Sequence, residues 1–245
     1  MRILNFFKRS KNTSVKTAAI IVAAGSSSRM NHENKLFIDI LGKPALAYTL
    51  EAFQDAALID EIIIVSKQQD ILVVSDIIKA FNITKATAVI PGGETRTQSV
   101  RAGLDSELLC DYVAIHDGAR PCILAEHIDK TVSAAITFGA AALGCKVFDT
   151  LKRVNDDLQI KGTINRDGVW QIQTPQVFKS DIIKDAYAYA LENGIEATDD
   201  CGLVENTGVN IAAVEGSRAN IKITHHDDVP LAAAIIAQQR GSDFS

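Results

Sequence analysis

The strongest constraint on the fold of this chain is a regular alternation of short apolar runs with segments of helical periodicity between residues 18 and 147. Five runs rich in Ile, Val and Ala have the length of buried strands: 18–24, 61–66, 86–90, 111–117 and 140–147. Amphipathic segments separate them: 44–53, 71–81, 95–104 and 125–139. Nearly continuous apolar strands separated by helices are typical of a mostly parallel sheet with helices on both faces. The sequence therefore predicts one Rossmann-like α/β domain.

The composition narrows the functional class. Of the 245 residues, 47% are hydrophobic and 22% charged, as in an average globular domain, and no apolar stretch is long enough to span a membrane. A formal net charge of −5 argues against nucleic-acid binding, which needs a basic surface. The cysteines form no CxxC pair, which is typical of a reducing compartment: Cys110, Cys122, Cys145 and Cys201. We therefore expect a cytoplasmic protein without a membrane or nucleic-acid partner.

The alternation of apolar runs and helical segments stops after residue 147. Residues 148–178 alternate weakly and contain two turn signals, which favours a β-hairpin that forms a protruding arm over about 147–170. Regular pattern then resumes, with helices predicted over 180–192, from near Thr198 and over 227–239, and short strands over 209–214 and 220–223. We interpret 17–240 as a single domain and 241–245 as a tail. The segment 1–16 has no long apolar core of a signal peptide and is predicted to be a disordered extension, or alternatively a weak amphipathic surface contact.

The loop after the first predicted strand combines small residues with two cations. Ala23, Ala24 and Gly25 allow the backbone to approach a ligand closely, and successive N–H groups in such a turn form an anion-binding concavity. Arg29 and Lys35 add positive charge, so the loop suits a polyphosphate; the alternative is an ordinary solvated turn. The Walker and dinucleotide-binding glycine patterns are absent. The arrangement A-A-G-x-x-x-R-M followed by Lys is typical of the nucleotidyltransferases that make sugar nucleotides.

Ligands of such sheets bind beyond the carboxyl ends of the strands, so the tails of the third and fourth strands are the next candidates. After the third strand, Gly93 permits close approach, and Glu94, Arg96 and Ser99 supply polar groups, although a turn and a helix cap would use the same residues. At the end of the fourth strand, Asp117 can hold a metal ion or a hydroxyl, and Arg120 can bind phosphate in a bidentate manner. The alternative for Asp117 is a cap of the next turn.

Candidates also occur in the arm and beyond it. Thr150 and Arg166 lie on the predicted arm, and because such arms often exchange between subunits, they could serve the site of a neighbour or simply be solvated. Thr174 precedes a proline and is either a ligand contact or part of a turn. Lys222 has isoleucine on both sides, so in a strand it would point to the opposite face, toward solvent or the site.

Seven motifs together carry a resemblance to a known family: "VAAGSSSRM…K", "GGETRTQSV", "HDGARP", "DTLKR", "RDGVWQIQTPQVF", "ATDDCGLVE" and "NIKITHHDD". In this order, from about Thr17 to Arg240, the chain resembles the 2-C-methyl-D-erythritol 4-phosphate cytidylyltransferases. It departs from the family pattern at two positions. Asn34 stands before the loop lysine where many members have Pro, and Gly118 stands where many have Ala.

The resemblance implies a fold of the nucleotide-diphospho-sugar transferase type and a role for each matching position. It implies catalytic roles for Arg29, Lys35 and Lys222, and nucleotide binding by Ala23, Ala24, Gly25, Gly93, Glu94, Ser99, Asp117 and Gly118. It implies binding of the sugar phosphate by Asp117, Arg120, Thr150, Arg166, Thr174 and Lys222, partly across a homodimer formed through the arm. It also implies CTP and 2-C-methyl-D-erythritol 4-phosphate as substrates, and Mg²⁺ or a similar divalent cation held by Asp117.

Three other functions are compatible with parts of the pattern. A ribitol 5-phosphate cytidylyltransferase shares the fold and most of the loop. A catalytically inactive nucleotide-binding module would keep the fold, but the retained charged residues argue against it. An NAD-dependent oxidoreductase would need the glycine pattern that the first loop lacks.

Overall fold

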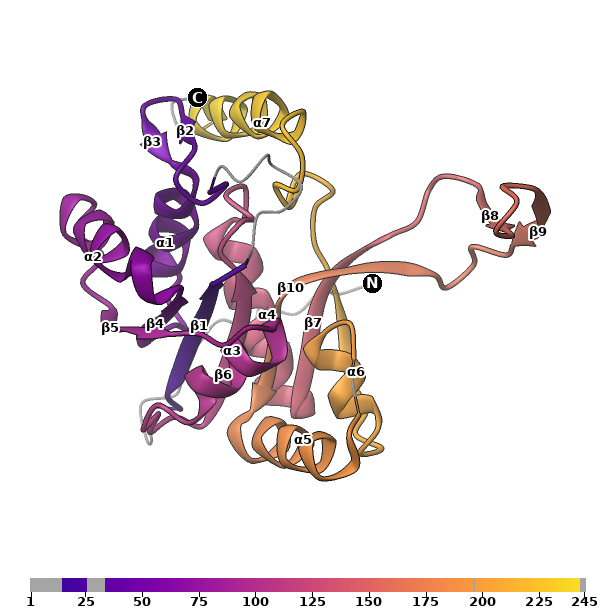
Figure 1. Ribbon diagram of the computed structural model, residues 1–245, viewed down its shortest axis with the longest axis horizontal. Helices are drawn as coiled ribbons and strands as arrows, with labels where there is room; N and C mark the ends of the chain where they lie inside the picture. Colours follow the sequence, from indigo (N-terminus) through magenta and orange to yellow (C-terminus); the bar gives the residue numbers. More distant parts are fainter. Residues whose placement is uncertain (1–14, 26–33, 196, 243–245) are drawn as a thin grey trace, which may run out of the picture.

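The computed structural model describes residues 15–25, 34–195 and 197–242 of the chain. Within these residues a seven-stranded sheet has the order β11-β7-β10-β6-β1-β4-β5 (Figure 1). Its strands are β1 (Thr17–Ala23), β4 (Glu61–Ser66), β5 (Ala86–Pro91), β6 (Tyr112–Asp117), β7 (Ala140–Lys146), β10 (Trp170–Lys179) and β11 (Ala212–Glu215). All neighbouring pairs are parallel except those of β10, which runs antiparallel to β6 and β7. The prediction of a mostly parallel Rossmann-like sheet is confirmed.

Helices cover both faces of this sheet. On one face lie α1 (Ala45–Asp55), α2 (Ile71–Ala80) and α4 (Ala125–Phe138). On the other lie α3 (Arg96–Leu104), α5 (Ser180–Asn193) and α6 (Asp200–Glu205). Side chains of β1 alternate between the two cores, with Ile21 packed on the first face and Ile20 on the second. Both faces of the sheet are therefore covered by helices. A ligand can reach the sheet only at the ends of its strands.

Shorter elements complete the fold. The last helix, α7 (Asp228–Ser242), packs against a small ladder of β2 (Asp39–Ile40) and β3 (Lys43–Pro44). A 3-10 turn, η2 (Gln68–Asp70), joins β4 to α2. None of the described helices is both long and apolar enough to cross a membrane.

The arm projects away from the sheet, with β8 (Leu151–Val154) and β9 (Ile160–Ile164) paired at its tip (Figure 1). The predicted hairpin is therefore present, but the sequence pattern did not predict that the residues after it join the main sheet. Residues from Trp170 onward form β10 in the middle of the main sheet. Gln173 and Gln176 make this strand read as half-exposed, yet both are buried because their amides have partners: Ser217 O for Gln173, and the Asp199 carboxylate for Gln176.

The strand predicted over 220–223 is wrong. This segment has no strand ladder and is fixed by individual hydrogen bonds instead. The N–H of Ile223 donates to Ala119 O at 2.8 Å, and Arg120 donates to Asn220 O at 2.9 Å. Ile223 itself is fully buried against α7 and α1. The segment is therefore extended and rigidly attached next to the end of β6.

Candidate active site

A cleft of about 470 Å³ lies at the carboxyl ends of the adjacent strands β5, β4, β1 and β6. The register brings these ends together, since Ala23 pairs with Ser66, Ser66 with Pro91, and Val22 with Asp117. The lining residues are Val22, Ala24, Gly25, Lys35, Leu36, Lys67, Gly93, Glu94, Thr95, Arg96, Ser99, Asp117, Ala119, Lys222 and Thr224. This is the place where sheets of this kind bind ligands.

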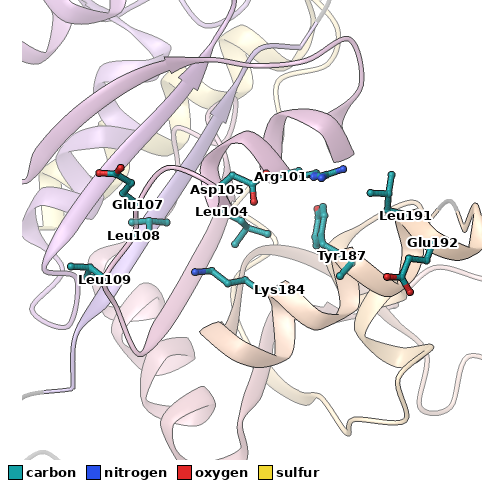
Figure 2. A pocket seen from close by; sticks show the side chains of 11 residues that line it. Arg101, Leu104, Asp105, Glu107, Leu108, Leu109, Lys184, Tyr187, Leu191 and Glu192 are labelled. Atoms are coloured by element: carbon teal, nitrogen blue, oxygen red, sulfur yellow. Dashed lines mark ion pairs between the residues drawn. The ribbon is translucent and has the colours of Figure 1, made fainter.

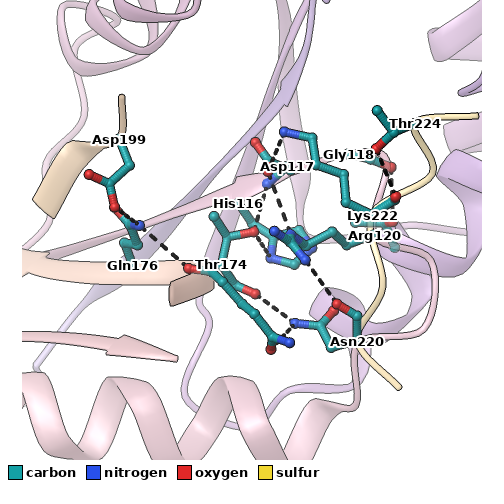
Figure 3. A network of polar contacts seen from close by, with 12 residues as sticks. His116, Asp117, Gly118, Arg120, Thr174, Gln176, Asp199, Asn220, Lys222 and Thr224 are labelled. Carbon is teal, nitrogen blue, oxygen red and sulfur yellow. Dashed lines mark hydrogen bonds and ion pairs between the residues drawn. The ribbon is translucent and has the colours of Figure 1, made fainter. Parts of the chain in front are cut away.

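Asp117 is surrounded by three cations at the end of β6. Its carboxylate lies 2.8 Å from Lys222 Nζ and 3.5 Å from both Arg96 Nε and Arg120 Nε. Figure 3 shows Lys222 and Arg120 converging on it from the segment 220–222 and from the turn after β6. Burial alone would raise the pKa of the Asp117 carboxyl, but Lys222, Arg96 and Arg120 outweigh that effect and hold the pKa well below its usual range. The cluster keeps a positive excess, which suits a phosphate.

Thr174 and His116 support Asp117 from behind (Figure 3). The hydroxyl of Thr174 accepts the N–H of Asp117 at 3.1 Å and lies 3.1 Å from His116 Nδ1. The imidazole is completely buried, with its centroid 4.9 Å from that of the Phe53 ring. Burial is the main reason that the pKa of His116 falls to about 3, so its imidazole is neutral at pH 7. Thr174 is only 4% exposed, and it therefore touches Asp117 rather than the open cleft.

The neutral His116 predicts an acid-sensitive fold. Its folded-state pKa lies below the unfolded value of about 6.5, so the unfolded state alone binds the proton and the free energy of unfolding falls as the pH drops from about 6.5 to about 3. His116→Asn, which keeps a polar group near Nδ1, should reduce the slope of this free energy against pH by about 1.4 kcal/mol per pH unit over roughly pH 4 to 6. Urea unfolding at several pH values measures the slope. His225→Asn, at an exposed histidine, is the control; equal slopes for wild type and His116→Asn would exclude this effect.

Arg96, one of the polar residues that follow the third predicted strand, is a site residue to which the sequence assigned no catalytic or binding role. It makes a bidentate ion pair with the fully buried Asp200, at 2.9 and 2.6 Å, and Tyr187 donates its hydroxyl to the same carboxylate at 2.6 Å. Burial alone would lower the pKa of Arg96, but the charge of Asp200 and its hydrogen bonds raise it above the ordinary value. The guanidinium is therefore a fixed positive charge beside Asp117. A buried Asp200 more than a hundred residues away is the reason, and no local pattern reveals it.

The segment that carries Lys222 is fixed by Asn220. This fully buried amide donates to Gln173 Oε1 and to Thr174 O, both at 3.0 Å. The same residue accepts the Arg120 hydrogen bond through its carbonyl. Lys222 thus reaches Asp117 from a backbone that β10 and the end of β6 hold in place. The cation is positioned before any ligand binds.

The structure places the other predicted residues in three groups. Besides Asp117 and Lys222, the cleft brings together Ala24, Gly25, Lys35, Gly93, Glu94 and Ser99. Beneath or beside it lie the buried Ala23, Gly118 and Thr174 and the half-buried Arg120, which shape the site or hold Asp117. Thr150 and Arg166 belong to the arm, which extends away from this cleft (Figure 1). Arg29 lies outside the described residues.

Two glycines explain the shape of the cleft wall. At Gly92, which follows β5, an added Cβ would lie 2.7 Å from both Ala24 Cβ and Ser99 Oγ, so the two loops can meet only around a glycine. At Gly118, an added Cβ would lie 3.2 Å from Val22 O and Leu46 Cδ1. The glycine at this position leaves slightly more room behind β1 than an alanine would.

A larger cavity, of about 690 Å³, lies on the outer side of α3 and α5. Leu104, Leu108, Tyr187 and Leu191 surround it, with charged side chains near its rim (Figure 2). None of the described residues predicted for the site lines this cavity. We therefore assign the chemistry to the smaller cleft, where the strand ends and the charged cluster meet.

Comparisons with known proteins agree with this geometry. The family model described as 2-C-methyl-D-erythritol 4-phosphate cytidylyltransferase matches residues 17–238. A relative of that name from Clostridium novyi is 42% identical over 223 residues, which cover 90% of this chain and 96% of the relative. The crystal structure of 4-diphosphocytidyl-2C-methyl-D-erythritol synthase from Anaerococcus prevotii is 33% identical, with a TM-score of 0.80 over 91% of this chain and 97% of that one. The cytidylyltransferase structure from Thermus thermophilus is 31% identical, with a TM-score of 0.74 over 89% and 98%. The chain therefore belongs to the 2-C-methyl-D-erythritol 4-phosphate cytidylyltransferase family.

Proposed function

We propose that this protein transfers the cytidylyl group of CTP to 2-C-methyl-D-erythritol 4-phosphate and releases pyrophosphate. Family membership supports the substrates, and the observation that carries the chemistry is Asp117 clamped by Lys222, Arg96 and Arg120 at the end of β6. The product is 4-diphosphocytidyl-2-C-methyl-D-erythritol, a precursor in the non-mevalonate route to isoprenoids.

In the proposed reaction, a phosphate oxygen of the sugar phosphate attacks the α-phosphorus of CTP. One P–O bond forms, the bond from the α-phosphorus to the bridging oxygen breaks, and that oxygen leaves with the pyrophosphate. The attacking oxygen is already ionised, so no strong base is needed. The difficulty is repulsion between two anions, and positioning and charge stabilisation therefore supply the catalysis.

The residues of the cleft divide this work. Ala24 and Gly25 offer backbone to the phosphates, and Lys35 and Lys222 neutralise the charge that builds up as pyrophosphate leaves. Gly93, Glu94 and Ser99 are proposed to contact the cytosine and its ribose. Ala23 and Gly118 shape the wall behind them. The catalytic role proposed for Arg29 is supported only by the sequence pattern, because this residue lies outside the described residues.

The site fits a magnesium ion that takes one carboxylate from the protein and its other ligands from phosphates and water. No cluster of three or more His, Cys, Asp or Glu side chains occurs among residues 15–25, 34–195 and 197–242, so a cage made only of those side chains is not built there. Mg²⁺ commonly binds one or two carboxylates together with phosphates and water, and the ionised Asp117 supplies one carboxylate. When bound, the ion would reduce the negative charge on the phosphate oxygens.

We further propose that the arm serves the site of a second subunit. Thr150 and Arg166 are on an arm that leaves its own cleft, and they are matched to positions that bind the sugar phosphate (Figure 1). Thr174 and Arg120 are also proposed to bind the sugar phosphate, and both contact Asp117. A homodimer joined through the arms would bring a guanidinium to the open side of each cleft.

Mixing two defective subunits tests this arrangement. Arg166→Ala should weaken binding of the sugar phosphate more than that of CTP, and Lys222→Ala should remove turnover. In a homodimer with composite sites, a mixed dimer has one intact site, so co-expressed subunits should recover about a quarter of wild-type activity. Steady-state pyrophosphate release measures the recovery. A mixture that stays as inactive as its components would place each arm at its own site.

The ribitol 5-phosphate alternative differs only in the second substrate. The matched family and the named relatives support methylerythritol phosphate instead. We expect pyrophosphate release from CTP to be at least about tenfold faster with methylerythritol phosphate than with ribitol 5-phosphate, because a site built for one set of hydroxyls leaves polar groups unpaired with the other. Equal rates would leave the substrate assignment without support.

A further inference from the structure

A lysine that no motif contains lines the same cleft as Lys35. Lys67 directly follows β4, whose end pairs with the end of β1, and it therefore lies beside the loop that carries Ala24 and Gly25. Within the described part of the chain, its ammonium forms no ion pair. A cation that lines a cleft without a carboxylate partner has its charge available for an anionic ligand.

Asn34 ties Lys35 to the segment that begins with Lys67. Its side-chain amide donates to Asp70 Oδ2 in η2 at 2.9 Å, and its Oδ1 accepts the N–H of Leu36 at 3.2 Å. Leu36 is only 3% exposed and is packed in the core. Lys35 thus stands between one residue bonded to η2 and one residue buried in the core. We name the Asn34–Asp70 hydrogen bond the latch.

At the other end of the latch, Asp70 is bonded to the backbone of Lys67. The N–H of Asp70 donates to Lys67 O at 2.9 Å, which closes the turn that starts at Lys67. The two lysines are 32 residues apart in sequence, yet one hydrogen bond and one tight turn connect their backbones. The backbones that carry the two lysines are therefore connected where both residues line the cleft.

We propose that the latch positions Lys35 and Lys67 as a pair of cations for the triphosphate, with Lys67 a further phosphate-binding residue. This inference rests on the proposed function, because it takes CTP as the nucleotide in the cleft. Asn34 and Asp70 are positioning residues and do not touch the ligand. Their effect is on the binding of the phosphates, not on the binding of cytosine.

Exchange of the two latch residues tests positioning. Asn34→Asp places two carboxylates together and should weaken CTP binding by about tenfold, the effect of losing a hydrogen bond to a charged group. Asn34→Asp combined with Asp70→Asn restores the bond with donor and acceptor reversed, and should return the CTP dissociation constant to within about twofold of wild type. Calorimetric titration measures binding, and Gln69→Ala, at an exposed neighbour in η2, is the control. Failure of the exchange to restore affinity, with the fold intact by circular dichroism, would overturn the latch.

Lys67→Gln tests the lysine itself. We expect CTP to bind about tenfold more weakly while CMP binds as before, because the missing contact is to the outer phosphates. Lys79→Gln removes the same charge from an exposed position of α2 and controls for the overall field. Equal weakening of CTP and CMP, or none, would overturn the role of Lys67. Binding is measured without turnover, so an enzyme that binds CTP but transfers nothing would contradict the proposed function and leave this result standing.

Discussion

Replacement of Asp117 with asparagine is expected to abolish turnover and to lower the free energy of unfolding by about 3–5 kcal/mol. The reason is that this buried carboxylate neutralises part of a half-buried positive cluster. Without it, Arg120 keeps no carboxylate partner within the described part of the chain, although Arg96 still pairs with Asp200. Lys222 also loses the partner at 2.8 Å that aims it into the cleft. The single carboxylate proposed for the metal ion is lost at the same time.

Chemical denaturation gives the stability and pyrophosphate release gives the turnover. Asp181→Asn is a matched control, because that aspartate pairs with Lys179 at the surface, where ion pairs contribute little. Asp117→Asn should be far less stable than this control. An Asp117→Asn protein with wild-type stability and measurable turnover would show that the cluster is not organised around this carboxylate.

Replacement of Lys222 with alanine should lower turnover by at least about a hundredfold with little change in the melting temperature. Lys222 is 38% exposed at its side chain, so its removal leaves no buried cavity. Its ammonium points into the cleft, and removal of one oriented donor from an active site costs about 3–4 kcal/mol in the transition state. Asp117 keeps Arg96 and Arg120 as partners, which is why the fold should survive.

Stopped-flow or steady-state rates with saturating substrates separate this effect from weaker binding. Lys130→Ala, at an exposed lysine of α4, is the control for loss of a surface charge. Lys222→Arg should retain more activity than Lys222→Ala because it keeps the charge in a different shape. Turnover near the wild-type value in Lys222→Ala would remove this residue from the mechanism.

The sequence predicted the framework of the fold because strand and helix periods are local properties. The five apolar runs became β1, β4, β5, β6 and β7 with ends shifted by a residue or two. The failures also have a physical cause. Residues 170–178 were not predicted to join the main sheet, because buried glutamines in a strand look exposed until their partners are known. The segment 220–223 looks like a strand because its isoleucines alternate, but it is held by single hydrogen bonds.

Site residues could be predicted from the sequence where several polar residues follow directly after a predicted strand. Asp117 and Lys222 were both selected, but their contact could not be read from residues 105 positions apart. Arg96 was noted as a polar residue after the third strand but received no role, because its buried partner Asp200 comes from a distant helix. Lys67 was missed because the tail of β4 was not considered, and only the strand order shows that it lies next to β1. Asn34 differs from the family pattern, and the latch gives that difference a structural role.

The most direct test of this account is a competition with limiting CTP, Mg²⁺ and equal amounts of 2-C-methyl-D-erythritol 4-phosphate and ribitol 5-phosphate. Mass spectrometry identifies the nucleotide product. The account predicts that 4-diphosphocytidyl-2-C-methyl-D-erythritol accumulates in step with pyrophosphate, and that the Lys222→Ala protein forms almost none. A product made mainly from ribitol 5-phosphate, or no cytidylyl transfer by the wild-type protein, would contradict it.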